Sequence, residues 1–175
     1  DSTDRYLPVW EQDLTLRDAF QTSCVPCYQE LARKIGVDNM KQYLHKLDFG
    51  DMHVSEESMD DFWLIGLSKI SPFQQIDFLE RLHDGRLPIS SATSETVNSI
   101  LEIRSNDAYS LRGKTGLAIN GLKDVGWFVG YVEKEEAVYY FATKISPKSY
   151  EMDRTFFGTL RQLVSLQALS VLEII

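Results

Sequence analysis

The sequence predicts an α+β fold, in which a helical region is followed by an antiparallel sheet with a helix across it. Two observations carry this prediction. Up to residue 105, apolar side chains recur at the three- and four-residue spacing of amphipathic helices. From residue 108 the period changes to two, as in half-buried strands, until a last helical stretch closes the chain. Such segregation of helices and strands along a chain is typical of α+β domains.

Turn and cap residues divide the first part into helices. Ser23 is a candidate N-cap with Pro26 in the first turn, and Gly36 ends that helix. Ser71 and Pro72 open another helix, as N-cap and first helical residue. The predicted helices span residues 14–23, 23–36, 37–50, 71–85 and 91–105, and an irregular segment, 51–70, carries a tryptophan within an apolar run.

Three strands are predicted in the second part. They span residues 109–119, 125–134 and 137–145, with a polar hairpin at "EKEE" between the last two. Residues 154–172 form the closing helix. Because three strands and one helix leave a sheet edge open, we expect residues 1–175 to be a single domain that is incomplete at its N-terminal side.

Charge and hydropathy exclude some classes of function. The net charge is −8, so nucleic acid is a poor candidate partner, because phosphate binding needs a basic face. The candidates for local positive charge are Lys114, Arg112 and Arg154. No apolar run reaches the roughly 18 residues of a membrane span. The chain shows no signal peptide and starts without methionine, from which we expect an upstream segment that was removed or left out.

The two cysteines, Cys24 and Cys27, have the spacing of a redox pair or of half a metal site. No second pair completes a zinc site, and no strand-rich thioredoxin pattern precedes them. We therefore expect two small buried apolar side chains. The three histidines, His45, His53 and His83, are scattered over polar positions and are assigned no chemistry.

One set of residues fits acyl-transfer chemistry. A strand that carries Lys114, Thr115 and Gly116 offers backbone N–H groups to a developing oxyanion. Gly116 permits close approach of a ligand, while Lys114 and Thr115 supply charge and a hydroxyl for a substrate carboxylate. Ser23, at a helix start, is placed to relay a proton to a leaving nitrogen, so the parts of an acyl-transfer site are present.

The chain resembles the class D β-lactamases, which belong to the penicillin-recognising serine acyl-enzymes. The resemblance runs along nearly the whole chain, and it implies a β-lactamase/transpeptidase-like fold. The segments that carry it are "TSCVPCYQELARKIG", "FGD", "DDFWLIGLSKISPFQQIDFLERL", "LRGKTG" and "DVGWFVGYVEKEEAVYYFA".

The resemblance implies a role for each matching position. Ser23 is the proton shuttle of a Ser-x-Val motif that ends at Val25. Trp63 matches the tryptophan that bonds a carboxylated lysine, although a core position would also explain it. The Lys-Thr-Gly motif at 114–116 binds the β-lactam carboxylate, and Arg154 is the candidate clamp on that group. Phe49-Gly50-Asp51 stands where the family has Tyr-Gly-Asn and is interpreted as a turn.

The chain departs from the family in one respect. None of its lysines has a serine or threonine three residues earlier, so the nucleophilic Ser-x-x-Lys motif is expected upstream of these residues. The resemblance implies no cofactor except carbon dioxide, held there as a lysine carboxylate. It also implies an exported bacterial protein, periplasmic or extracellular, that acts on β-lactams. Whether it forms a homodimer is open.

The sequence is compatible with three functional classes. The first is a β-lactam hydrolase. The second is a β-lactam sensor domain, which is acylated without turnover. Val25 favours the hydrolase, because the resemblance implies asparagine at this position in the sensors. The third is a truncated, catalytically dead relative. The departure of Phe49-Gly50-Asp51 from the family's Tyr-Gly-Asn favours this class.

Overall fold

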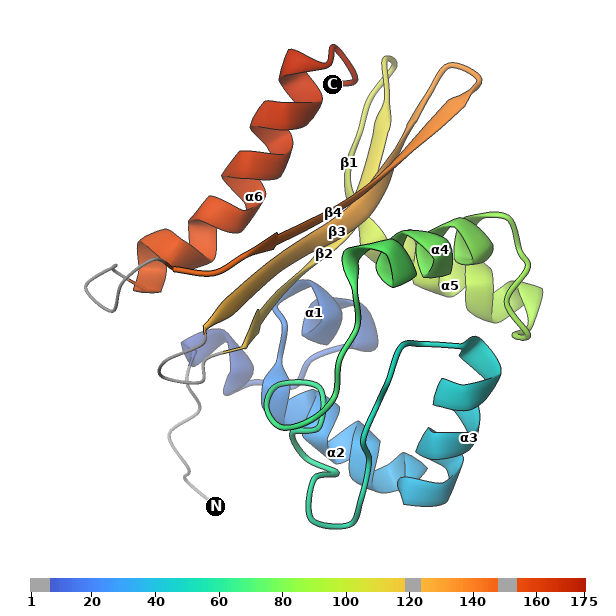
Figure 1. Cartoon of the computed structure of the whole chain (residues 1–175), viewed down its shortest axis with the longest axis vertical. Helices are drawn as coiled ribbons and strands as arrows, with labels where there is room; N and C mark the ends of the chain where they lie inside the picture. The colour runs from blue at the N-terminus through green and yellow to red at the C-terminus, as the bar shows by residue number, and fades with distance from the viewer. Residues whose placement is uncertain (1–6, 119–123, 148–153) are drawn as a thin grey trace.

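The computed structural model describes residues 7–118, 124–147 and 154–175. It confirms the α+β prediction, with helices on both sides of an antiparallel sheet (Figure 1). Before the sheet come a 3-10 turn, Pro8–Trp10, and the helices α1 (Leu16–Gln21), α2 (Val25–Ile35), α3 (Val37–Leu47), α4 (Pro72–His83) and α5 (Ser91–Leu101). The chain closes with α6 (Arg154–Val171).

Four strands form the sheet in the order β1-β2-β3-β4, each antiparallel to its neighbours. They are β1 (Glu102–Ser105), β2 (Ser110–Ala118), β3 (Val125–Lys134) and β4 (Ala137–Ile145). β2 and β3 cross closely where Gly113 faces Gly130. A Cβ on Gly130 would lie 2.1 Å from the carbonyl oxygen of Arg112, so this approach requires glycine.

β1 corrects the prediction of a helix over residues 91–105 and of three strands. The helix ends at Leu101, and the chain turns directly into β1 at Glu102, whose backbone is extended. All four residues of β1 are exposed, so they carry no inward-facing apolar pattern that would have predicted a strand. The helix predicted over 37–50 is also shorter, because it ends at Leu47 and Asp48 takes a left-handed conformation.

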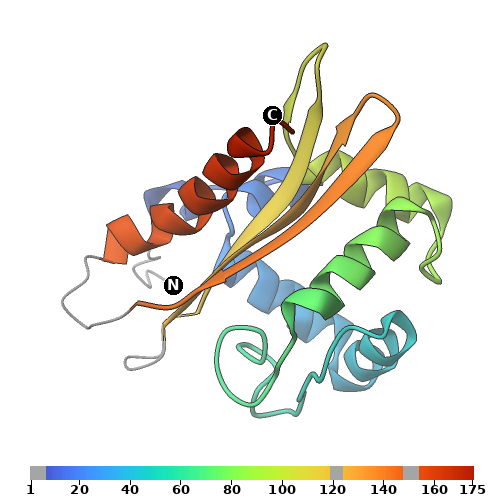
Figure 2. The ribbon, with the colours of Figure 1, turned by 45° about the horizontal axis from the view of Figure 1, so that its top comes forward.

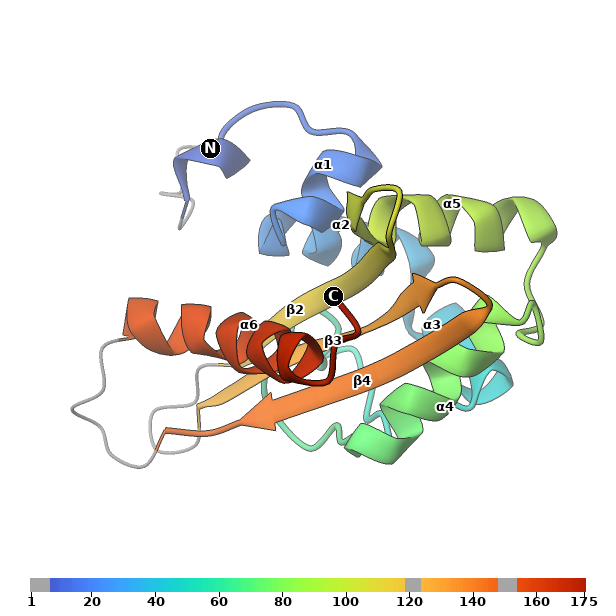
Figure 3. The same cartoon turned by 90° about the horizontal axis from the view of Figure 1, so that it is seen from above.

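Both faces of the sheet are covered. Val132 of β3 packs with Leu111, Leu169 and Ile174 on the side of α6. The next residue back, Tyr131, points the opposite way, as strand alternation requires, and its hydroxyl donates to Asn98 Oδ1 of α5 at 2.8 Å. Figure 3 shows α6 on one face of the sheet and α4 with α5 on the other.

The remaining helices form a lobe next to the sheet. α2 and α3 pack with the segment 51–70, which loops between α3 and α4 (Figure 2). Gln29 donates to the carbonyl oxygen of Asp60 at 3.1 Å, and Arg33 forms an ion pair with the Asp60 carboxylate. The segment is therefore fastened to the outer turns of α2.

The start of α4 is as predicted. Ser71 Oγ accepts a hydrogen bond from the backbone N–H of Gln74, and the Gln74 side chain accepts one from Ser71 N–H, with Pro72 at the first helical position. This reciprocal capping box satisfies two backbone donors that a helix start leaves free. None of the helices in the described ranges combines the length and apolar character of a membrane span.

Candidate active site

The turn between α1 and α2 holds Ser23 in a left-handed conformation, with φ of 53°. Its N–H donates to the carbonyl oxygen of Phe20 at 3.2 Å, and the next N–H, of Cys24, donates to that of Ala19 at 2.8 Å. The N-cap of α2 is Cys24, whose Sγ accepts from Cys27 N–H. The prediction of Ser23 as the N-cap was wrong by one residue, and this frees the Ser23 hydroxyl for another contact.

Cys24 and Cys27 are joined in a disulfide, which corrects the expectation of two separate thiols. The N-cap and third helical positions lie on the same side of the first turn, so their side chains meet. The expected burial is confirmed for Cys24, which packs fully buried against Trp10 and Ala19, while Cys27 is half-buried.

Lys114 of β2 reaches across to this turn. Its Nζ donates to Ser23 Oγ and to the carbonyl oxygen of Thr115, the latter at 2.9 Å. The ring of Phe20 lies 5.5 Å from Nζ, at cation–π distance. Two predicted site residues that are far apart in the sequence, Ser23 and Lys114, therefore meet directly.

Burial, and to a lesser extent the charge of Arg161, lower the pKa of Lys114 from 10.5 to about 8. Desolvation penalises the ammonium form, and a like charge nearby does the same. Near pH 8 the charged and neutral forms of Lys114 are thus both populated. A lysine in this state, bonded to a hydroxyl, is suited to pass a proton through that hydroxyl.

Arg161 of α6 is a site residue that the sequence reasoning missed. Its Nη1 donates to the carbonyl oxygen of Gly116 at 2.6 Å. Burial lowers the pKa of Arg161, and its buried Nε has no partner among the described residues. The sequence spacing could have indicated it. Arg161 follows Arg154 by seven residues, about two helical turns, and so lies on the same helix face. Arg154 begins α6, but its side chain lies outside the described residues.

Thr115 and Gly116 continue β2 beyond Lys114. Alternation turns the Thr115 side chain to the opposite face from Lys114, and Thr115 pairs with Phe128 of β3. A Cβ on Gly116 would meet only Trp127 Cβ, at the ordinary distance of 3.5 Å. Packing within the chain therefore does not demand glycine at 116, and the absent side chain leaves room for a ligand.

The Lys-Thr-Gly stretch lies at an edge of the sheet. β1 pairs with β2 only as far as Arg112, so within the described ranges residues 113–118 have a neighbouring strand on the β3 side alone. Arg112 itself forms ion pairs with Glu133 and Glu102. These carboxylates neutralise its charge, so Arg112 is a poor candidate for binding an anion.

Val25 and Trp63 lie in apolar surroundings. Val25 is the first residue of α2 and packs against the cluster around Trp10 and Cys24. Trp63 packs against the cluster of Ala32, Val54, Met59 and Phe62, and its ring meets that of Phe62 edge-on at 5.0 Å. These contacts tie Trp63 to the helical lobe, not to Lys114.

Phe49-Gly50-Asp51 is a turn, as predicted. Gly50 has φ of 67°, and a Cβ there would lie 2.7 Å from the carbonyl oxygen of Lys69. Asp51 and Lys69 exchange two backbone hydrogen bonds, each of 2.8 Å. Phe49 packs edge-on against Phe78 of α4, with the ring centres 4.6 Å apart. The turn thus anchors segment 51–70 at the end nearest α4.

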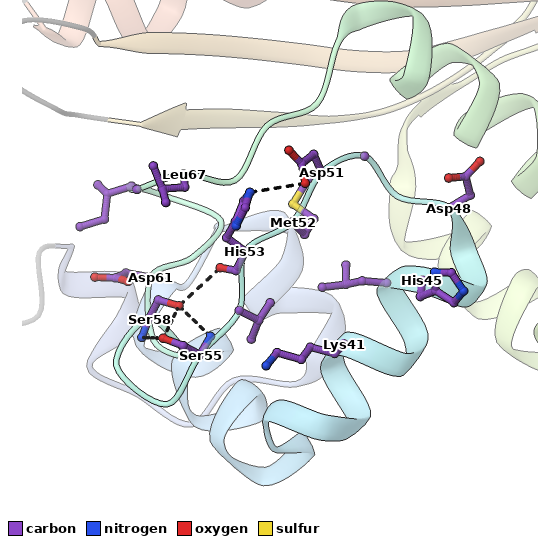
Figure 4. Close-up of a pocket in the computed structure, with 15 residues that line it drawn as sticks. Lys41, His45, Asp48, Asp51, Met52, His53, Ser55, Ser58, Asp61 and Leu67 are labelled. Carbon is purple, nitrogen blue, oxygen red and sulfur yellow. Dashed lines mark hydrogen bonds and ion pairs between the residues drawn. The ribbon is translucent and has the colours of Figure 1, made fainter.

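A cavity of about 760 Å³ lies between α3 and the segment 50–67 (Figure 4). Its wall includes Lys41, His45 and Asp61, and His53 Nε2 lies 3.4 Å from Asp51 Oδ1 beside it. Neither Ser23 nor Lys114 lines this cavity. No group of three metal-binding side chains occurs within the described residues. We therefore place the candidate chemistry at the Lys114–Ser23 contact.

Comparisons with known proteins identify the family of the chain. The family model of the penicillin-binding protein transpeptidase domain matches residues 2–156. The β-lactamase OXA-10 of Pseudomonas aeruginosa is 39% identical over 145 residues, which cover 81% of this chain and 54% of that protein. The chain thus spans about half the length of this curated relative.

Solved structures extend the similarity to the whole fold. The class D β-lactamase YbXI from Nostoc is 39% identical with a TM-score of 0.90, over 99% of this chain and 71% of that one. The C-terminal domain of the Bacillus licheniformis BlaR penicillin receptor is 30% identical with a TM-score of 0.86, over 100% of this chain and 69% of that one. The chain therefore belongs to the penicillin-binding protein transpeptidase-domain family, in which its relatives include class D β-lactamases.

Proposed function

We propose that this chain is part of a class D serine β-lactamase, which hydrolyses the amide of penicillin-type antibiotics through an acyl-enzyme. The observation that carries the proposal is the hydrogen bond from Lys114 Nζ to Ser23 Oγ. It joins the two motifs that the family resemblance assigns to proton transfer and carboxylate binding. The similarity to proteins named as class D β-lactamases supports the same reaction.

In the proposed acylation step, the proton relay serves the leaving nitrogen. A serine hydroxyl gives its proton to a general base, which the resemblance implies is the carboxylated lysine. The serine oxygen forms a bond to the lactam carbonyl carbon, the carbon–nitrogen bond breaks, and the nitrogen gains a proton. Ser23 Oγ donates that proton and recovers one from the Lys114 ammonium. The attacking serine and its carboxylated lysine belong to a Ser-x-x-Lys segment outside these 175 residues, so that residues 1–175 form the larger part of one domain.

Substrate binding in this proposal uses the β2 edge. The β-lactam carboxylate lies at the open edge of β2, beside the backbone of Lys114, Thr115 and Gly116, with Arg154 as its clamp. Arg161 holds the Gly116 carbonyl and adds a second positive charge nearby. An anionic substrate needs such local cations, because the chain carries a net charge of −8.

Val25 and Trp63 define the proposed pocket of the carboxylated lysine. Trp63 donates its indole N–H to the lysine carboxylate, and Val25 keeps the pocket apolar, so that the carboxylated lysine persists and deacylation follows. The packing of Trp63 against the helical lobe holds its ring in place, which supports a role in orienting the lysine carboxylate.

The proposed location is outside the cytoplasm, in the periplasm or the extracellular space of a bacterium, where the protein contributes to antibiotic resistance. The Cys24–Cys27 disulfide supports an oxidising compartment. No homodimer is part of the proposal, because no observation bears on subunit contacts.

A β-lactam sensor is the second candidate, supported by the similarity to the BlaR receptor domain. A sensor shares the fold and the acylation step but does not release the product. Val25 argues against it, because a sensor needs a polar side chain at this position to strip the carboxylated lysine.

The proposal is tested by replacing Ser23 in the full-length protein. Ser23→Ala removes the relay, and we expect benzylpenicillin hydrolysis, followed by absorbance, to fall by about 10²–10⁴-fold, the usual contribution of a positioned acid–base group. Ser91→Ala is the matched control, because Ser91 is an exposed serine at the start of α5. Equal loss in both variants, or no loss in either, would refute the relay.

A further inference from the structure

The disulfide beside Ser23 plays no part in the proposed reaction, yet it occupies the start of the helix that carries the relay. Cys24 directly follows Ser23, and it is bonded to Cys27 in the first turn of α2. We propose that Cys24 and Cys27 form a reversible thiol–disulfide site, which a dithiol reductant opens, and that its oxidised form holds Ser23 against Lys114.

The helix start suits a released thiolate. Cys24 is the N-cap of α2, an eleven-residue helix, and its Sγ already accepts a hydrogen bond of 3.3 Å from Cys27 N–H. The positive end of the helix dipole and this N–H both favour negative charge on Cys24 sulfur. When the disulfide opens, these two interactions offset the cost of negative charge on a buried sulfur.

Burial sets the direction of exchange. Cys24 is 0% exposed, whereas Cys27 is half-buried, so an incoming thiolate reaches Cys27 Sγ. A bond forms between the reductant and Cys27, the bond between Cys24 and Cys27 breaks, and Cys24 leaves as a thiolate. The second thiol of the reductant then displaces Cys27. Two electrons and two protons pass from the dithiol to the cysteine pair, and the reductant becomes a disulfide.

The site is coupled to Ser23 through the backbone. Ser23 has φ of 53°, a conformation that is disfavoured for residues other than glycine and persists only where the surroundings impose it. On the α1 side, the hydrogen bonds from Ser23 N–H to Phe20 and from Cys24 N–H to Ala19 stabilise this conformation. On the α2 side the disulfide fixes the adjacent residue, Cys24, to the first turn. Reduction removes this covalent restraint and leaves Cys24 held by its backbone hydrogen bonds to Ala19 and Tyr28, so we expect the contact of Ser23 Oγ with Lys114 Nζ to loosen.

Thiol counting tests whether the site is reversible. The folded, oxidised protein should take up no iodoacetamide by intact mass. After dithiothreitol it should take up a carboxamidomethyl group at the half-buried Cys27 with an unchanged circular dichroism spectrum, and a second at the buried Cys24 only when it is then unfolded. Oxidised glutathione should restore the unreactive state. Reduction that occurs only in denaturant would overturn the proposal.

The coupling is tested on Lys114 itself, without any β-lactam, so its outcome is independent of the proposed hydrolysis. The ¹³Cε resonance of Lys114, assigned by its loss in Lys114→Arg, is titrated in ¹³C-lysine-labelled protein. In the oxidised form the midpoint is expected near the pKa of about 8 that burial and the charge of Arg161 produce. In dithiothreitol it should rise by about one unit or more, as the ammonium regains water.

Cys27→Ser is the matched variant. It cannot form the disulfide, so its Lys114 midpoint should equal that of the reduced protein both with and without dithiothreitol. A midpoint that stays the same on reduction of the unaltered protein would overturn the coupling, whatever the variant shows.

Discussion

At the scale of single residues, the account depends on the charge state of Lys114. Its Nζ lies between the Ser23 hydroxyl and the Phe20 ring, where burial and the charge of Arg161 lower its pKa to about 8. An ordinary lysine would stay charged through this range. Lys114 therefore changes charge at a pH where a free lysine side chain would stay charged.

This makes a prediction for the pH dependence of hydrolysis. The ammonium form of Lys114 supplies the proton and attracts the substrate carboxylate, and it predominates below its pKa. We therefore expect kcat/KM for benzylpenicillin to fall as the pH rises through about 8, well below the ordinary lysine range. Initial rates between pH 6 and pH 10 measure this fall. Above the midpoint, kcat/KM should decrease about tenfold per pH unit.

Lys114→Arg is the control for this prediction, because arginine keeps its charge across the whole range. Whatever activity this variant retains should lose the decline near pH 8. A kcat/KM of the unaltered protein that stays level up to pH 10 would contradict the assignment of Lys114 as proton donor.

At the scale of elements, the site is built by turns that bring separate segments together. The turn between α1 and α2 presents Ser23 to β2, and α6 presents Arg161 to the Gly116 carbonyl. The turn at Phe49-Gly50-Asp51 fastens segment 51–70, which carries Trp63, through the Asp51–Lys69 bridge. Each turn depends on backbone conformations that a periodic pattern does not reveal.

Two glycines allow the cost of a left-handed backbone to be measured separately from the cost of steric overlap. Gly50 and Gly85 share φ of 67°, but a Cβ would lie 2.7 Å from Lys69 O at Gly50 and would meet nothing within 4 Å at Gly85. We expect Gly85→Ala to cost about 1–2 kcal/mol of stability from the left-handed backbone alone. Gly50→Ala should cost about 1–3 kcal/mol more from overpacking. Urea unfolding measures the loss in free energy of unfolding for both variants. Equal losses would show that the backbone at the Asp51–Lys69 bridge moves to accommodate the added Cβ without cost.

At the scale of the whole molecule, the sequence predicted the order of helices and strands because their periodicities are long and regular. It failed at β1, whose four residues are all exposed and so carry no inward-facing pattern. The close crossing of Gly113 and Gly130 was likewise hidden, since it depends on the register between two strands.

The site was predicted in part. Ser23 and Lys114 followed from motifs, and the structure brings them together. The disulfide was missed because cysteine spacing alone does not distinguish a bonded pair from two buried thiols. Arg161 was missed because its role comes from the packing of α6 against β2, which is a tertiary relation. The roles of Thr115, Gly116, Val25, Trp63 and Arg154 stay predictions.

The most direct test of the account is the intact mass of the purified full-length protein during a short exposure to benzylpenicillin. We predict a penicilloyl adduct that appears and then disappears while penicilloate accumulates. An adduct that persists without product would identify a sensor. No adduct at all, in protein that is folded and carries its upstream segment, would contradict the claim that Lys114 and Ser23 serve an acyl-enzyme.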